Sequence, residues 1–129
     1  MRLCEFDAPE KVKFEVDRTG NGQFVVGMYS NGKDIGTFGY ALVGDEAKNI
    51  AEVSPLQKNK GYGKLLLLKA IYTANTLNIP FYEDTQEVSI EQSRVYDSLF
   101  DSFYIMQPEH EDQWYVTEEG YDYLKANTE

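Results

Sequence analysis

The chain has 129 residues, of which 42% are hydrophobic and 26% charged, and this composition predicts one globular domain over residues 1–129. One cysteine and one histidine exclude a disulfide framework and leave too few ligands for a zinc site, so we expect no metal. The net charge of −10 arises late in the chain: residues 1–79 carry 10 basic and 9 acidic side chains, whereas residues 80–129 carry 2 basic and 13 acidic ones. The acidic second part would repel phosphate and so disfavours nucleic-acid binding.

The acidic second part of the chain instead favours cationic partners, such as amines or basic protein segments, although solubility alone would also explain it. The sequence shows no charged leader followed by an apolar stretch, and no apolar run of about 18 residues. We therefore expect a soluble, cytoplasmic protein that has no membrane partner.

The first part of the chain is typical of antiparallel strands joined by tight turns, because apolar and polar residues alternate along it. Asn31-Gly32 is its strongest hairpin signal, since both central positions of that turn adopt positive φ. A further turn is expected over 44–48. The four expected strands span residues 12–18, 23–29, 35–43 and 49–54.

Helical periodicity begins only after Gly61, where apolar residues recur every three or four positions and predict a largely buried helix over 61–77. Pro80 follows its end, and Phe81-Tyr82 reads as a short buried strand. Ser89-x-x-Gln92 is a capping box that predicts a second helix from Ile90.

Two short strands, over 103–106 and 113–116, are expected to form a hairpin near the end of the chain. Thr117 is then expected to cap a last helix that runs to Lys125. These elements predict the α+β class: a mixed, mostly antiparallel central sheet with a helix after the fourth strand, a second helix, the hairpin and a short last helix.

Between Ala51 and Leu68 the chain changes from a predicted strand, through a loop rich in lysine and glycine, into the apolar helix. The first N–H groups of a helix lack an intrahelical partner and lie at the positive end of its dipole, so a phosphate can bind there. Glycine at 61 and 63 would let its oxygens approach the backbone. The charged residues from Val53 through Tyr82 are all basic: Lys58, Lys60, Lys64 and Lys69.

Two common phosphate motifs do not fit this loop. A P-loop would need a Gly-Lys-Ser/Thr, and a dinucleotide fingerprint would need glycine where Leu66 stands. The run from Val53-x-Pro55 through Lys58 to Gly61-Tyr62-Gly63 instead resembles the acetyl-CoA loop of the GNAT superfamily of N-acetyltransferases, usually Gln/Arg-x-x-Gly-x-Gly/Ala after a strand that ends in Val-x-Pro. Lys58 takes the place of the Gln or Arg.

The resemblance covers about residues 10–116 and implies the GNAT fold from its second strand onward. It implies acetyl-CoA as co-substrate, with the pantetheine arm on free backbone groups of the fourth strand and the pyrophosphate on the amides that follow. Family members place helices between the first two strands, where this chain has only residues 19–22, which implies an open acceptor face. The implied cofactor-binding residues are Ala51, Val53, Lys58, Asn59, Lys60, Gly61, Tyr62, Gly63 and Lys64.

Val95-Tyr96-Asp-Ser-Leu99 resembles the Leu-Tyr-x-x-Leu-Gly-Phe signature of the family, which implies that Tyr96 is the general acid that protonates the departing thiolate. The glycine of that signature is absent, and two extra residues precede Phe103. A tyrosine of the core is the structural alternative for Tyr96. Four carboxylates near the expected site could act as general base or be solvated strand ends, namely Glu46, Glu52, Glu83 and Asp84, and we select Glu52.

The sequence therefore predicts an acetyl-CoA-dependent N-acetyltransferase that acts on an amine of a protein or another macromolecule. The alternative is a binding protein of the same fold, with little or no transferase activity, that docks a basic partner through its acidic C-terminal half.

Overall fold

The computed structural model describes residues 11–44, 46–53, 61–83 and 90–129, with residues 51–53 and 91 described by their backbone alone. The α+β class expected from the sequence is confirmed, because a four-stranded sheet is followed by helices, a small hairpin and a last helix. The elements are β1 (Lys13–Gly20), β2 (Gln23–Ser30), β3 (Lys33–Val43), β4 (Glu46–Val53), α1 (Tyr62–Thr76), α2 (Ile90–Asp101), β5 (Ile105–Met106), β6 (Tyr115–Val116) and α3 (Glu118–Ala126).

The four strands of the large sheet lie in chain order, and every neighbouring pair is antiparallel. The Asn31-Gly32 hairpin is confirmed, with φ of 52° and 76° at the two residues. β4 begins earlier than the sequence suggested, because Val43 already pairs with Glu46. The expected turn over 44–48 is therefore shorter than predicted.

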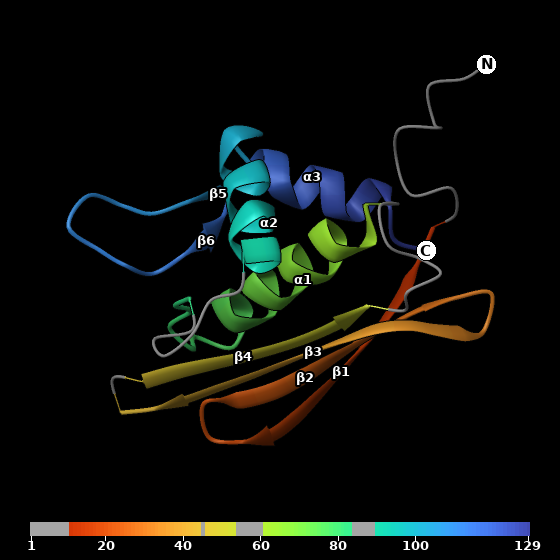
Figure 1. The fold of residues 1–129 in the computed structure, drawn as a ribbon, viewed down its shortest axis with the longest axis horizontal. Coiled ribbons are helices and arrows are strands. Elements are labelled where there is room, and N and C mark those ends of the chain that lie inside the picture. The colour runs from red at the N-terminus through yellow and green to blue at the C-terminus, as the bar shows by residue number, and fades with distance from the viewer. Residues whose placement is uncertain (1–10, 45, 54–60, 84–89) are drawn as a thin grey trace.

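α1 is the central element of the core. It lies across one face of the sheet, and α2 and α3 lie on the side of α1 that faces away from the sheet (Figure 1). Its contacts on both sides explain why apolar residues surround this helix instead of forming one stripe. Within the described part of the chain, no helix covers the opposite face of the sheet, where Ile50 is 60% exposed.

The prediction of a short strand at Phe81-Tyr82 is wrong. Phe81 is fully buried, but this segment has no strand partner among the described residues. Its backbone is paired in other ways: the carbonyl of Phe81 accepts from the N–H of Trp114 at 2.9 Å, and the N–H of Tyr82 donates to the hydroxyl of Tyr40 at 3.1 Å. The large sheet is consequently antiparallel throughout.

The C-terminal elements follow the expected order but with shorter strands. α2 begins at Ile90 as predicted, and the capping residue Ser89 lies outside the described residues. Thr117 caps α3 as predicted, since its side chain accepts a hydrogen bond of 3.0 Å from the N–H of Gly120. The chain then returns to Val12, the residue before β1, with which Thr128 forms an isolated parallel bridge. In the described part, no helix is long and apolar enough to cross a membrane.

Candidate functional site

The start of α1 combines a left-handed glycine with the absence of a side-chain cap. Gly61 precedes the helix with φ of 81°, a left-handed conformation that favours glycine. No side chain caps this end of the helix, and the first turn contains no acidic residue. A Cβ added at Gly61 or Gly63 would meet no atom of the described residues within 4 Å. Within the described part of the chain, the N–H groups of Gly63 and Lys64 thus lie at the open start of the helix.

The structure places the other expected cofactor residues only in part. Ala51 and Val53 lie in β4, paired with Phe38 and Gly36 of β3. In the described residues β4 has no strand on its other side, and alternate residues of such an edge strand leave their backbone groups unpaired. Tyr62 is buried in the core, and Lys64 is half-buried in the first turn of α1. Lys58, Asn59 and Lys60 lie outside the described residues.

Tyr96, the expected general acid, joins α2 to the middle of β4. Its hydroxyl donates a hydrogen bond of 3.1 Å to Oδ1 of Asn49, and the Nδ2 of Asn49 donates to the carbonyl of Tyr82 at 3.4 Å. Tyr96 is only 2% exposed, and its ring packs against Trp114 with the centroids 5.8 Å apart. Tyr96 is therefore a buried residue that links α2 to β4, and its role as general acid stays a prediction.

Tyr40 fixes the segment after α1 against the sheet. Its hydroxyl donates to the carbonyl of Pro80 at 2.7 Å and accepts from the N–H of Tyr82. Burial raises the pKa of Tyr40 to about 12, an effect that the hydrogen bond with Tyr82 partly offsets. This neutral phenol therefore holds residues 80–82 beside β3, and Glu83 follows directly.

Glu83 is a partly buried carboxylate that contacts Trp114, a neighbour of Tyr96. Its Oε1 accepts a hydrogen bond of 3.3 Å from Nε1 of Trp114, the same indole that packs against Tyr96. Burial raises the pKa of Glu83, the indole hydrogen bond lowers it, and the nearby charge of Asp97 raises it. A carboxylate with a raised pKa is better suited to accept a proton than a solvated one.

Of the two residues selected as catalytic from the sequence, Glu52 can be placed only by its backbone, which lies in β4 and pairs with Thr37 of β3. Its role as a base stays a prediction. Sequence reasoning kept Glu83 as an alternative but missed Trp114, because an indole in a short strand gives no sign of the carboxylate that it will contact. Among the described residues, no group of three or more His, Cys, Asp or Glu is placed to hold a metal ion.

Comparison of the chain with protein-family models, with curated proteins and with solved structures finds no match.

Proposed function

We propose that this chain is an acetyl-CoA-dependent N-acetyltransferase that moves an acetyl group to an amine of a protein or another macromolecule. The observation that carries the proposal is the start of α1, where left-handed Gly61 precedes a helix with no side-chain cap and no described atom lies within 4 Å of a Cβ added at Gly61 or Gly63. In the sequence, Lys58 and Lys60 come directly before this helix start. Such a helix start binds phosphate through groups that have no other partner.

In the proposed reaction, the neutral amine attacks the thioester carbonyl of acetyl-CoA. The new C–N bond forms, the C–S bond breaks, and the amine proton passes to a base. We take Glu83 as the base because burial raises the pKa of its carboxyl, and Glu52 remains the alternative selected from the sequence. Tyr96 then supplies a proton to the departing thiolate, which a phenol with a usual pKa of about 10 can do at low cost.

The shape of the N-terminal part supports a macromolecular acceptor. β1 passes into β2 through a two-residue turn, so no helix covers the sheet between these strands. An uncovered face can accept the amine of a large substrate, whereas a small metabolite would need walls on several sides.

The test is the shift in melting temperature that acetyl-CoA causes. We expect a shift for the wild-type chain and none for Gly63→Glu, whose carboxylate would repel the diphosphate while fitting the open space at this position. Thr76→Glu adds the same charge at the opposite, exposed end of α1 and should keep the shift. An unchanged wild-type melting temperature at millimolar acetyl-CoA would refute the proposal.

A second candidate is a binding protein of the same fold that lacks activity. The burial of Tyr96 and its bond to Asn49 favour this alternative, because both are also what a core tyrosine would show. Acetylation of a recovered partner with radiolabelled acetyl-CoA separates the two: label on the partner supports the enzyme, and stoichiometric capture without label supports the binding protein.

A further inference from the structure

Three exposed apolar side chains lie close together where α2 ends and β5 begins. Phe100 is 52% exposed, Phe103 75% and Met106 44%, and they fall within seven consecutive residues. We call these three residues the α2–β5 corner. Single exposed apolar residues are ordinary, but an aromatic pair with a methionine on one corner is the composition of a contact surface.

The backbone at Phe103 is unfavourable for this residue type. The N–H of Phe103 donates to the carbonyl of Phe100 and the N–H of Tyr104 to that of Leu99, each at 3.0 Å, which is the pattern of a Schellman motif. Phe103 takes the left-handed position of that motif, with φ of 64°, where glycine is preferred. The folded chain is therefore less stable than it would be with glycine here, and it also exposes the aromatic ring.

α3 is held against this corner through its first turn. The hydroxyl of Thr117 donates to the carbonyl of Phe103 at 2.5 Å, and the N–H of Thr117 donates to the carbonyl of Tyr104 at 3.0 Å. Gly120 allows the approach, because a Cβ at this position would overlap the carbonyl of Tyr104. The residues that open α3 are thus fixed beside Phe103.

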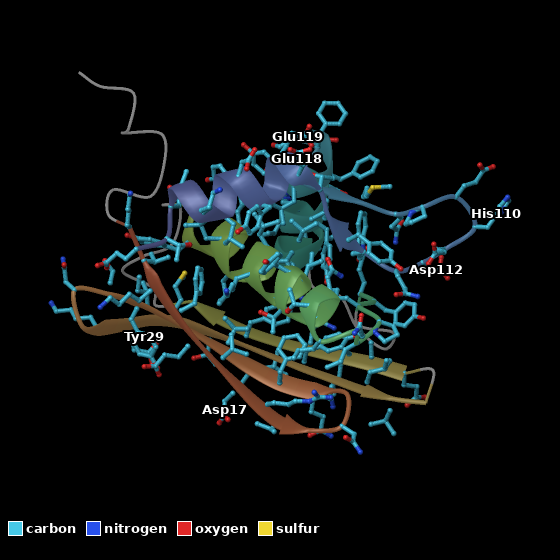
Figure 2. The ribbon with its side chains drawn as sticks, turned by 180° about the vertical axis from the view of Figure 1, so that it is seen from behind. Asp17, Tyr29, His110, Asp112, Glu118 and Glu119 are labelled. Atoms are coloured by element: carbon cyan, nitrogen blue, oxygen red, sulfur yellow. The ribbon has the colours of Figure 1, made fainter. Side chains whose placement is uncertain are left out.

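Carboxylates surround the corner. Glu118 and Glu119 project from the start of α3, on the side of the molecule away from the large sheet (Figure 2). Asp97 and Asp101 are exposed on α2, and Asp101 ends that helix, where the negative end of the dipole disfavours an acidic residue. In the part of the chain that the structure describes, none of these carboxylates is in an ion pair, although α2 also carries the exposed Arg94.

We propose that the α2–β5 corner is a docking surface for a basic protein segment that inserts an apolar side chain beside Phe103. The left-handed Phe103, the exposed rings and the acidic end of α2 each destabilise the chain in isolation. A partner with apolar and cationic groups would make the exposed rings and the acidic end of α2 favourable in the complex. It would also account for phenylalanine in the left-handed position at 103. A second copy of the chain, or an anionic membrane, would bring like charges to the same carboxylates. This surface does not depend on acetyl transfer.

The probe for this proposal is a short synthetic peptide of alternating Lys and Leu, compared with a Lys/Gln peptide and a Glu/Leu peptide of the same length. Binding is followed by the fluorescence of Trp114, whose ring lies 6.0 Å from that of Phe100 in an edge contact. We expect saturable binding of the Lys/Leu peptide, about tenfold or more tighter than of either other peptide, and weaker at high salt.

The deciding variant is Phe103→Gly. It should raise the melting temperature, because glycine fits the left-handed backbone, and should weaken binding about tenfold or more. A loss of binding in a more stable protein cannot come from unfolding. Ile50→Thr removes an exposed apolar group elsewhere and should leave the affinity unchanged.

A charge-matched pair completes the test. Asp97→Asn with Asp101→Asn should weaken binding, whereas Glu109→Gln with Asp112→Asn removes the same charge from exposed positions between β5 and β6 and should not. Equal affinities for the wild type and Phe103→Gly, no binding of the Lys/Leu peptide, or self-association that Phe103→Gly abolishes would each overturn the proposal.

Discussion

The phenol of Tyr96 in α2 donates its hydrogen bond to the side-chain amide oxygen of Asn49 in β4, 3.1 Å away. Residues 47 positions apart in the chain thereby join the second helix to the last strand of the sheet. This hydrogen bond stabilises the packing of α2 against β4, and it also lies where the proposed chemistry would occur. The two roles predict different consequences of mutation.

Replacing Tyr96 with Phe should lower the free energy of unfolding by about 1 kcal/mol, because Asn49 loses one partner while the ring packing is kept. If Tyr96 is the general acid, kcat should fall by about 100-fold or more as well. Urea unfolding and an acetyl-transfer assay measure the two effects. Tyr104→Phe removes a hydroxyl elsewhere and serves as the control. A variant of Tyr96 that loses stability but keeps kcat would leave the tyrosine with the structural role alone.

The two glycines at the start of α1 should respond in opposite directions to alanine. Gly61→Ala forces a Cβ into left-handed backbone and should cost about 1–2 kcal/mol of stability. Gly63 lies inside the helix beside open space, so Gly63→Ala should stabilise the fold by up to about 1 kcal/mol. The same alanine should reduce the melting shift caused by acetyl-CoA, because its methyl group stands where the phosphates would approach.

Gly63→Ala is the deciding variant, because it is expected to raise the stability of the fold and to weaken the binding of acetyl-CoA. If Gly63→Ala raises the melting temperature and leaves the acetyl-CoA shift intact, the open space beside the helix start is not the diphosphate site.

Glu83→Gln should be more stable than the wild type at neutral pH. The folded pKa of Glu83 lies above its usual value of 4.5, so the folded state holds the proton more firmly than the unfolded state does. The free energy of unfolding therefore falls as pH rises through the unfolded and folded pKa values of Glu83. Glutamine still accepts the hydrogen bond from the indole of Trp114 but has no proton to lose, so the variant does not show this fall. The gain should disappear at about pH 3, well below the ordinary pKa of a glutamate, where the carboxyl is protonated in both states.

The activity of the same variant tests the proposed base. Glu83→Gln should reduce acetyl transfer by about 100-fold or more despite its greater stability, whereas Glu52→Gln should reduce it less. The reverse order of the two effects would return the role of base to Glu52.

The sequence predicted those parts of the fold that local rules determine. Asn31-Gly32 needed positive φ at both residues, α1 carried a clear helical period, and Thr117 stood where a cap was required. Each of these signals depends on residues within a few positions of one another, so nothing distant in the chain could override it.

Contacts between distant residues were the parts that could not be predicted. Phe81 looked like a strand residue, but its carbonyl is taken by Trp114, 33 positions later. Asn75 lies in the last turn of α1, and its side chain donates to the carbonyl of Trp114 and accepts from the N–H of Val116. Phe103 in left-handed backbone was equally hidden, because no local pattern calls for phenylalanine where glycine is preferred.

The hydroxyl of Tyr40 should make the stability of the protein sensitive to alkaline pH. Its pKa is raised from 10.0 to about 12 in the folded chain, chiefly by burial. The folded state thus keeps the phenol proton where the unfolded state has begun to lose it, so the contribution of this hydroxyl is complete below pH 10 and is lost as pH rises from 10 to about 12.

Tyr40→Phe loses the bonds to Pro80 and Tyr82 but has no proton to titrate. The stability difference between wild type and variant, measured by urea unfolding, should therefore shrink across that range. The tyrosinate absorbance of the folded wild type should include a late-titrating group that Tyr40→Phe lacks. A difference that stays constant with pH would mean that the hydroxyl is open to water.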